Sequence, residues 1–226
     1  MSGREEILGR VREALSVPSH AGVKAVSGEG VRDVREARGF LPDGGSTTEA
    51  RLAKFRELAA KLKAEVELLP DLAAAGTYLA DLAKKEGWRQ IASHRHDLTN
   101  PALESLGVPI LWTDDEPSTA DLEKVEAGVT SCEALIAQTG SVLVTGKGCG
   151  GRALSVLPPH HVVMATLDQL LPDMLAGFDL LRERYRDQLP SFVSFITGAS
   201  RTGDIERILV LGAHGPKRLT ILILEN

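Results

Sequence analysis

Apolar positions in the first 45 residues form one short stripe and then stop. Between Ser2 and Leu15 they recur at helical spacing, and Ser2 with Glu5 has the pattern of a capping box. From 16 to 45 the chain is rich in glycine and proline, which predicts an extended arm. We therefore expect an N-terminal helix and arm over 1–45 and a domain over 46–226.

Helix and strand patterns alternate in the first half of the expected domain. Ser46 and Glu49 predict a second capping box that opens a helix. After it the pattern predicts, in order, a strand at 65–69, a helix at 71–86, a strand at 88–93, a helix capped by Asn100 and a strand at 108–112. This alternation predicts an α/β fold with a mostly parallel sheet flanked by helices, and ligands at the carboxyl ends of the strands.

The second half departs from this alternation at two apolar runs. Segments 134–137 and 141–144 are too close together for a helical crossover, so we expect a hairpin or a bent strand and hence a mixed sheet. The remaining pattern predicts a helix ending near 188 and strands at 161–166, 192–197, 207–211 and 218–224.

Composition narrows the class of protein. The net charge of -5 and the aromatic content of 4% argue against a nucleic-acid partner, which needs clustered basic residues or stacking platforms. No apolar run is long enough for a membrane span, and the charged start of the chain is unlike a signal peptide. Two cysteines are too few for a disulfide framework or for an iron–sulfur cluster. We expect a cytoplasmic protein that holds no such cluster itself.

A glycine-rich turn at 146–151 follows an apolar strand and contains the spacing G-x-G-x-x-G. The segment after it is too short for the crossover helix of a dinucleotide-binding fold, which argues against that function. Two interpretations remain. The turn is either a flexible loop or an anion site, in which backbone N–H groups act with Lys147 and Arg152.

Two further polar turns lie between strands near the C-terminus. The turn at 198–206 carries Ser200, Arg201, Thr202 and Asp204, which could bind a carboxylate or phosphate or could simply close a capping turn. In the turn at 212–216, His214 stands in a glycine-bracketed position at a strand end. It is either a general acid or base or an incidental turn residue.

Other chemically capable residues have no diagnostic context. His94 and His96 lie one residue apart on an expected strand and could join Asp97 at a metal, but a third ligand at a recognisable spacing is missing, so we predict no metal site. None of the candidate nucleophiles stands in a known elbow motif; these are Cys149, Ser141, Ser155 and Glu133.

Four sequence blocks together resemble the LUD domain family, the family of lactate utilization protein C. In the family's order, they occupy residues 134–141, 152–160, 200–206 and 212–216. The resemblance implies a fold of the group that contains NagB, ribose-5-phosphate isomerase and the CoA transferases. It also implies a role in oxidising L-lactate to pyruvate beside iron–sulfur partner proteins. Cys149 and the glycines at 148, 150 and 151 match no family role, and no glutamate stands where a CoA-transferase nucleophile would.

The predicted site combines the family blocks with the glycine turn. We expect His214 and Asp204 to be catalytic, and we expect the ligand to be bound by Thr139, Gly140, Lys147, Gly148, Arg152, Ser200, Arg201, Thr202 and Gly215. The function expected is that of an accessory, non-redox component of a lactate utilization system, which binds a small carboxylate, a nucleotide-like ligand or an iron–sulfur partner. The alternative is a freestanding enzyme acting on a phosphorylated or CoA-linked small molecule. A homo-oligomer formed through the arm is a further expectation.

Overall fold

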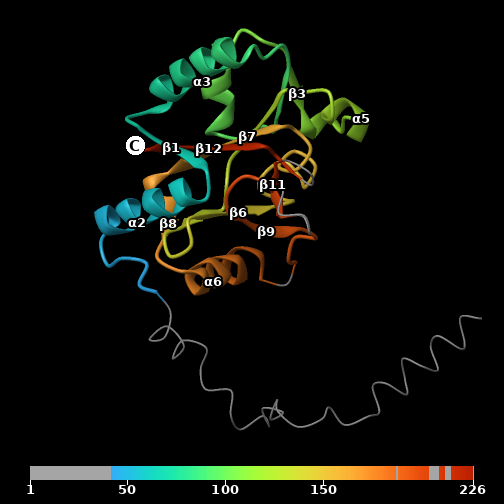
Figure 1. Ribbon diagram of the computed structural model, residues 1–226. Coiled ribbons are helices and arrows are strands. Elements are labelled where there is room, and N and C mark those ends of the chain that lie inside the picture. Colours follow the sequence, from blue (N-terminus) through green and yellow to red (C-terminus); the bar gives the residue numbers. More distant parts are fainter. Residues whose placement is uncertain (1–41, 187, 204–208, 212–214, 226) are drawn as a thin grey trace, which may run out of the picture. The chain divides into compact units, whose positions relative to one another are not determined.

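The structure is a computed structural model, and it describes residues 42–225 except 187, 204–208 and 212–214 (Figure 1). The expected N-terminal helix and all but the end of the arm lie outside these residues, so the domain boundary near 45 stays a prediction. Within the described part of the chain, no helix has the length and apolar character needed to cross a membrane.

The largest of the three described sheets has six strands, and every neighbouring pair of strands runs parallel. Its strand order is β1 (Ala64–Leu69), β12 (Arg218–Leu224), β7 (His160–Thr166), β4 (Ala127–Thr130), β2 (Ile91–Ser93) and β3 (Ile110–Trp112). The carboxyl ends of all six strands therefore lie at one edge of the sheet, as the alternating pattern predicts.

In the described part of the chain, antiparallel pairing is confined to two smaller sheets. A four-stranded sheet has the order β8 (Leu170–Leu171), β5 (Ala134–Ile136), β6 (Ser141–Thr145) and β9 (Val193–Ile196). In it β5 and β6 form the expected hairpin, while β5 and β8 are parallel. A two-stranded ribbon pairs β10 (Arg201–Gly203) with β11 (Leu209–Leu211). We expected the hairpin to make the main sheet mixed. The hairpin instead belongs to the separate four-stranded sheet, and this sheet is the mixed one.

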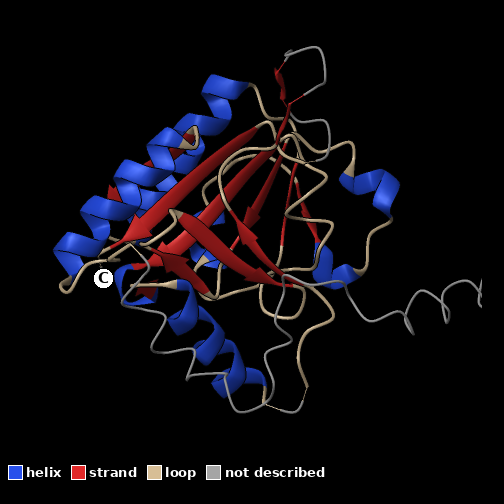
Figure 2. Cartoon of the chain, turned by 60° about the horizontal axis from the view of Figure 1, so that its bottom comes forward, coloured by secondary structure: helices blue, strands red, loops and turns tan. Residues whose placement is uncertain are grey.

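The helices lie on the outside of the strands in Figure 2. The α-helices are α2 (Thr48–Lys61), α3 (Leu72–Glu86), α4 (Thr99–Leu103), α5 (Thr119–Leu122) and α6 (Met174–Tyr185). Two short 3₁₀ turns, η2 (Thr113–Asp115) and η3 (Leu167–Gln169), follow β3 and β7.

Alternating side chains of the central strands build separate core layers. On β7, Val163 packs into the core shared with α2 and the four-stranded sheet, whereas Val162 and Met164 pack on the opposite face with α3. On β5, Leu135 faces the six-stranded sheet, while Ile136 faces α6. The four-stranded sheet is therefore covered on both faces, which explains why all three residues of β5 are buried.

Helix ends show where the sequence signals hold. Asp71 caps α3 by accepting from the backbone N–H of Ala74 at 2.8 Å, and Gly87 ends the helix with a φ of 70°. The cap of α2 is Thr47 rather than Ser46. The expected cap Asn100 lies inside α4, where its side-chain oxygen accepts from the backbone N–H of His96 at 3.2 Å instead. Two of the predicted caps are therefore wrong: Thr47 takes the place of Ser46, and α4 begins after Leu98 without a side-chain cap.

Candidate ligand-binding cavity

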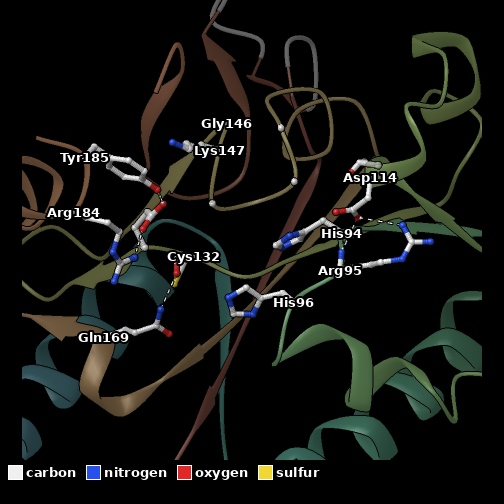
Figure 3. Close-up of a pocket in the computed structure, with 15 residues that line it drawn as sticks. His94, Arg95, His96, Asp114, Cys132, Gly146, Lys147, Gln169, Arg184 and Tyr185 are labelled. Atoms are coloured by element: carbon white, nitrogen blue, oxygen red, sulfur yellow. Dashed lines mark hydrogen bonds and ion pairs between the residues drawn. The ribbon is translucent and has the colours of Figure 1, made fainter. Parts of the chain in front are cut away.

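A cavity of about 680 Å³ opens where strands of the six-stranded sheet end (Figure 3). Residues directly after β2, β3 and β4 meet there with the loop after β6, with η3 and with the end of α6. Its lining consists of His94, Arg95, His96, Thr113, Asp114, Cys132, Glu133, Lys147, Gln169, Arg184, Tyr185 and the glycines at 146, 148, 150 and 151. The cavity thus occupies the position that a parallel sheet predicts for a ligand.

A buried carboxylate anchors one wall of the cavity. The side chain of Glu133 is only 2% exposed, and it is paired with the guanidinium of Arg184. The hydroxyl of Thr145 donates to it at 2.5 Å, and the hydroxyl of Tyr185 donates to the same carboxylate oxygen. Burial and then the bond to Glu133 raise the pKa of Tyr185 to about 12. Two elements, β6 and α6, thus supply three donors to one buried carboxyl group.

The glycine loop over 146–151 closes directly above this carboxylate. A Cβ atom at Gly148 would lie 2.3 Å from a Glu133 oxygen, and one at Gly150 would lie 2.7 Å from the Cβ of His94. Gly150 and Gly151 also have φ values of 77° and 91°, in the left-handed region. The glycines after Lys147 therefore let the backbone approach two polar side chains closely.

Several donors of this loop are unused. The backbone N–H groups of Gly148 and Cys149 donate to Thr145 at 2.9 and 3.2 Å. Within the described part of the chain, the N–H groups of Lys147, Gly150 and Gly151 have no acceptor. The ammonium of Lys147 forms no ion pair with a described residue and lies 6.0 Å from the Tyr185 ring centroid. Unused N–H groups beside a lysine are suited to an anion.

Two histidines form the opposite wall. Nε2 of His94 accepts the backbone N–H of Ser131 at 3.1 Å, so its neutral ring carries hydrogen on Nδ1. Burial, and then the neighbouring His96, lower the pKa of His94 to about 4. Nδ1 of His96 accepts the N–H of Leu98 at 3.2 Å, which leaves its hydrogen on Nε2. The ring centroids are 5.5 Å apart.

The sequence suggested a role for His94 and His96 only as part of a metal site, which we did not predict. Across the described ranges, no group of three or more histidine, cysteine or acidic side chains is arranged to hold a metal ion. Because each ring already uses one nitrogen as an acceptor from the backbone, each offers its other nitrogen as a hydrogen-bond donor.

At the rim, Arg95 joins the cavity to a second hollow. Its backbone N–H donates to Asp114 at 2.8 Å, its guanidinium pairs with Asp115 at 2.7 Å, and it lies 5.3 Å from the Trp112 ring centroid. The second hollow, of about 450 Å³, is lined by Arg95, Asn100, Leu103, Glu104, Gly107, Val108, Ile110 and Trp112. We call it the Trp112 groove.

The two cysteines are free and buried. Burial raises the pKa of Cys149 to about 11, and it raises that of Cys132 well above the ordinary range. The thiolate form needed for nucleophilic attack is therefore scarce at neutral pH. The two serines considered as nucleophiles are also engaged, since Ser141 bonds Thr139 and Thr197, and Ser155 donates to the carbonyl of Arg152.

Only part of the predicted site meets at the cavity. Lys147 and Gly148 line it, whereas none of the other predicted residues belongs to its described lining. Thr139 and Gly140 form the β5–β6 turn, where a Cβ at Gly140 would lie 2.9 Å from the backbone nitrogen of Ala59. That glycine therefore serves close packing on α2.

The remaining predicted residues lie elsewhere or outside the described ranges. The guanidinium of Arg152 lies 5.8 Å from the Phe192 ring centroid. Gly215 packs on Ser200, with a Cβ at Gly215 placed 3.2 Å from that of Ser200, and Arg201 is exposed at the start of β10. Asp204, His214 and the side chain of Thr202 lie outside what the structure describes, so their proposed roles stay predictions.

Sequence reasoning missed most of the polar wall. Glu133 was considered only as a nucleophile, and Arg184 and Tyr185 were not singled out. One signal was available: Ser131, Cys132 and Glu133 come directly after a buried strand, at the end where ligands are expected. Arg184 and Tyr185 reach the site only through the packing of α6 on the second sheet, which no local pattern reveals.

Comparison with known proteins identifies relatives of the chain. The LUD domain model matches residues 52–224. Lactate utilization protein C of Bacillus velezensis is 30% identical over 125 residues, covering 53% of this chain and 52% of that protein. Its namesake in Deinococcus radiodurans is 31% identical over 120 residues, covering 53% and 56%. The chain thus matches about half the length of these curated relatives.

A solved structure shares the fold. The crystal structure of a DUF162 family protein from Deinococcus radiodurans aligns with a TM-score of 0.63 and 22% identity, covering 80% of this chain and 99% of that one. At this level of identity the agreement shows that the two chains share a fold, which in this chain is an α/β architecture with a parallel six-stranded sheet flanked by helices.

Proposed function

The chain belongs to the LUD domain family, and from this premise we propose that it is an accessory protein of lactate utilization whose cavity binds a small anion. The observation that carries the proposal is the glycine loop, where Lys147 and neighbouring backbone N–H groups have no ion-pair or hydrogen-bond partner among the described residues. The lactate context comes from the names of the relatives, and the anion site comes from the geometry.

The charges around the cavity support an anionic ligand. Glu133 is paired with Arg184, and the Arg95 guanidinium lies 4.0 Å from Asp114, so each carboxylate of the lining has a cation beside it. Lys147 forms no ion pair with a described residue, and each histidine keeps one ring N–H as a donor. A carboxylate or phosphate therefore meets several donors in a partly enclosed space, where charge-assisted hydrogen bonds are strong.

We assign the redox step to partner proteins. With two cysteines, both buried, the chain has too few thiolates for a four-cysteine iron–sulfur cluster. In this proposal the iron–sulfur partners oxidise lactate, and this chain binds a ligand or stabilises the assembly.

The first test is genetic. In a strain that lacks the gene, growth on L-lactate as sole carbon source should fail and be restored by the wild-type chain. Lys147→Ala should restore it poorly because the anion loses its ammonium partner. Lys61→Ala is the matched control, since Lys61 is exposed and, among the described residues, pairs only with Glu57 on its own helix. Normal growth of the deletion strain would refute the lactate role.

The second test is biochemical. Lactate, pyruvate, phosphate and pyrophosphate should be titrated against purified wild type, Lys147→Ala and Lys61→Ala while thermal unfolding is followed. A ligand present at about 100 times its dissociation constant stabilises the folded state by about 2.7 kcal/mol. We expect that gain for at least one anion, lost in Lys147→Ala alone. Equal stabilisation of all three proteins would show that the anion binds elsewhere.

A further inference from the structure

We propose that the cavity and the Trp112 groove form one extended site for a nucleotide, with its phosphates at the glycine loop and its base at Trp112. The inference rests on the proposed function, because it identifies the anion bound in that cavity as the phosphate end of a larger ligand. Arg95 lies at the junction of the two hollows and belongs to the lining of both.

Size separates this ligand from lactate. The cavity alone measures about 680 Å³, and the groove adds about 450 Å³. Sites for ligands of drug or cofactor size span roughly 300–1,000 Å³. An acid as small as lactate would leave most of this space to water. A ligand that reaches from the glycine loop into the Trp112 groove must be several times larger.

The cavity end has the chemistry of a phosphate site. Lys147 supplies a point charge, and the N–H groups of Gly150 and Gly151 lack acceptors in the described structure. Both glycines have positive φ values, a backbone conformation open to glycine that other residues rarely adopt. On the facing wall, Nε2–H of His96 is a further donor. Phosphate oxygens can accept from all of these groups together.

The groove end has the chemistry of a base site. Trp112 is half-buried, and its ring forms the groove wall beside Val108 and Ile110. The planar guanidinium of Arg95 lies 5.3 Å from the Trp112 ring centroid and is fixed by Asp115. Aromatic rings and guanidinium planes are the surfaces on which bases stack. Such a wall gives a heteroaromatic ring a place that a sugar phosphate or a simple acid would leave empty.

Polar groups at the groove can meet the edge of a base. The side-chain oxygen of Asn100 accepts from the backbone of His96, so its amide hydrogens remain as donors. The Glu104 carboxylate is exposed and has no partner among the described residues, so it can accept from an exocyclic amino group. Together they offer a donor and an acceptor beside a stacking surface.

The experiment uses Trp112 as its own reporter. The chain has two tryptophans, and Trp88 is buried against His160, so Trp88→Phe leaves Trp112 as the sole tryptophan signal. AMP, ADP, GDP and NAD⁺ are titrated against this protein, with pyrophosphate and ribose 5-phosphate as ligands that lack a base. We expect at least one nucleotide to quench Trp112 and to bind about tenfold or more tightly than pyrophosphate, because base stacking adds to phosphate binding.

Two variants assign the ends of the ligand. Lys147→Ala should weaken both the nucleotide and pyrophosphate by about tenfold to a hundredfold, as expected for loss of a charged hydrogen-bond partner. Trp112→Leu should weaken the nucleotide by about fivefold to a hundredfold and leave pyrophosphate unchanged. Binding to both variants is followed by calorimetry, and unchanged circular dichroism shows that each is folded.

The outcomes separate this inference from the proposed function. If pyrophosphate binds through Lys147 but no nucleotide binds more tightly or alters Trp112 fluorescence, the extended site is wrong and the anion site stands. If no phosphate ligand binds, the extended site is likewise wrong, and the anion site then depends on carboxylates. If nucleotides bind equally well to wild type and Trp112→Leu, the base does not occupy the groove and the inference is overturned.

Discussion

Two arginine–glutamate clusters lie at opposite ends of the six-stranded sheet and differ in burial. At the carboxyl end, Glu133 is 2% exposed and is paired with Arg184. At the amino end, Arg218 joins Glu65 at 3.0 Å and Glu86 at 2.6 Å, and all three side chains are at least a quarter exposed. The arginine is partly exposed in both clusters, at 49% for Arg184 and 34% for Arg218, so the two clusters differ in the burial of the carboxylate.

The difference indicates what each cluster is for. Removing a carboxylate from water is costly, and a fold that needs only stability gains little from it. Glu133 nevertheless receives donors from β6 and α6 beside an open cavity, which is the arrangement of a site. The Arg218 cluster connects β12 with β1 and α3, where solvent screens the charges. We interpret the Arg218 cluster as a structural contact between these three elements.

The largest expected effect tests this contrast directly. Arg184→Met keeps most of the side-chain stem but leaves the buried Glu133 without its cation, so we expect the free energy of unfolding to fall by about 3 kcal/mol. Arg218→Met breaks exposed pairs and should cost about 1 kcal/mol or less. Urea unfolding of both variants measures the difference. Equal losses would show that burial does not distinguish the clusters.

The next effect concerns the close approach of the glycine loop. Gly148→Ala would place a Cβ atom 2.3 Å from a Glu133 oxygen, so we expect a loss of about 1–3 kcal/mol together with weaker anion binding. Gly151→Ala is the matched control in the same loop. A Cβ there meets nothing within 4 Å, so only the left-handed backbone, worth about 1–2 kcal/mol, opposes it. Unchanged anion binding in Gly148→Ala would mean that the carboxylate wall does not shape the site.

A smaller effect appears with pH, because each cluster has a buried histidine nearby. Burial lowers the pKa of His94 to about 4, and burial together with Arg218 lowers that of His160 to about 4. Both pKa values lie below the ordinary value of 6.5. Between pH 4 and pH 6.5 the unfolded chain therefore binds more protons than the folded chain does. Stability is then present above pH 6.5 and is lost as pH falls toward 4. Each histidine contributes at most about 1.4 kcal/mol per pH unit.

The histidines also report separately on their clusters. His160 bonds Thr220, and its charged surroundings are Arg218, Glu65 and Glu86. Arg218→Met removes the cation, so the pKa of His160 should rise while that of His94 stays unchanged. NMR titration of the imidazole protons measures both values. A shift of His94 in this variant would mean that the two ends of the sheet are coupled.

Much of the architecture followed from local pattern. The apolar run at 218–224 corresponds to β12 residue for residue, and α3 begins after Asp71 and ends before Gly87 as its caps predict. Short strands were less predictable. Strand β2 begins at Ile91 rather than 88, because the N–H of Trp88 still bonds the end of α3. The second sheet could not be separated from the first, since a hairpin pattern does not say which layer it joins.

The site was harder to predict, for a physical reason. The loop with Lys147 was recognisable because glycines next to a lysine have a local anion-binding logic. Thr139 and Gly140 were predicted to bind the ligand but lie away from the cavity. A turn glycine that is required for packing cannot be distinguished in the sequence from one that is required for a ligand. The wall of Glu133, Arg184 and Tyr185 joins a residue after β4 to two residues of α6 that are 51 and 52 positions away in the chain, so its charge balance exists only in the fold.

The loop at 146–151 also follows β6 of one sheet and leads toward β7 of the other. A ligand that bonds this loop and the histidines after β2 would act as a reversible crosslink between the two layers. Its binding energy would then appear in the cooperativity of unfolding. Amide hydrogens of β6 and β2 should exchange more slowly, and more nearly in step, when the ligand is present. Which parts of the chain unfold together would therefore depend on ligand occupancy as well as on the packing of the chain.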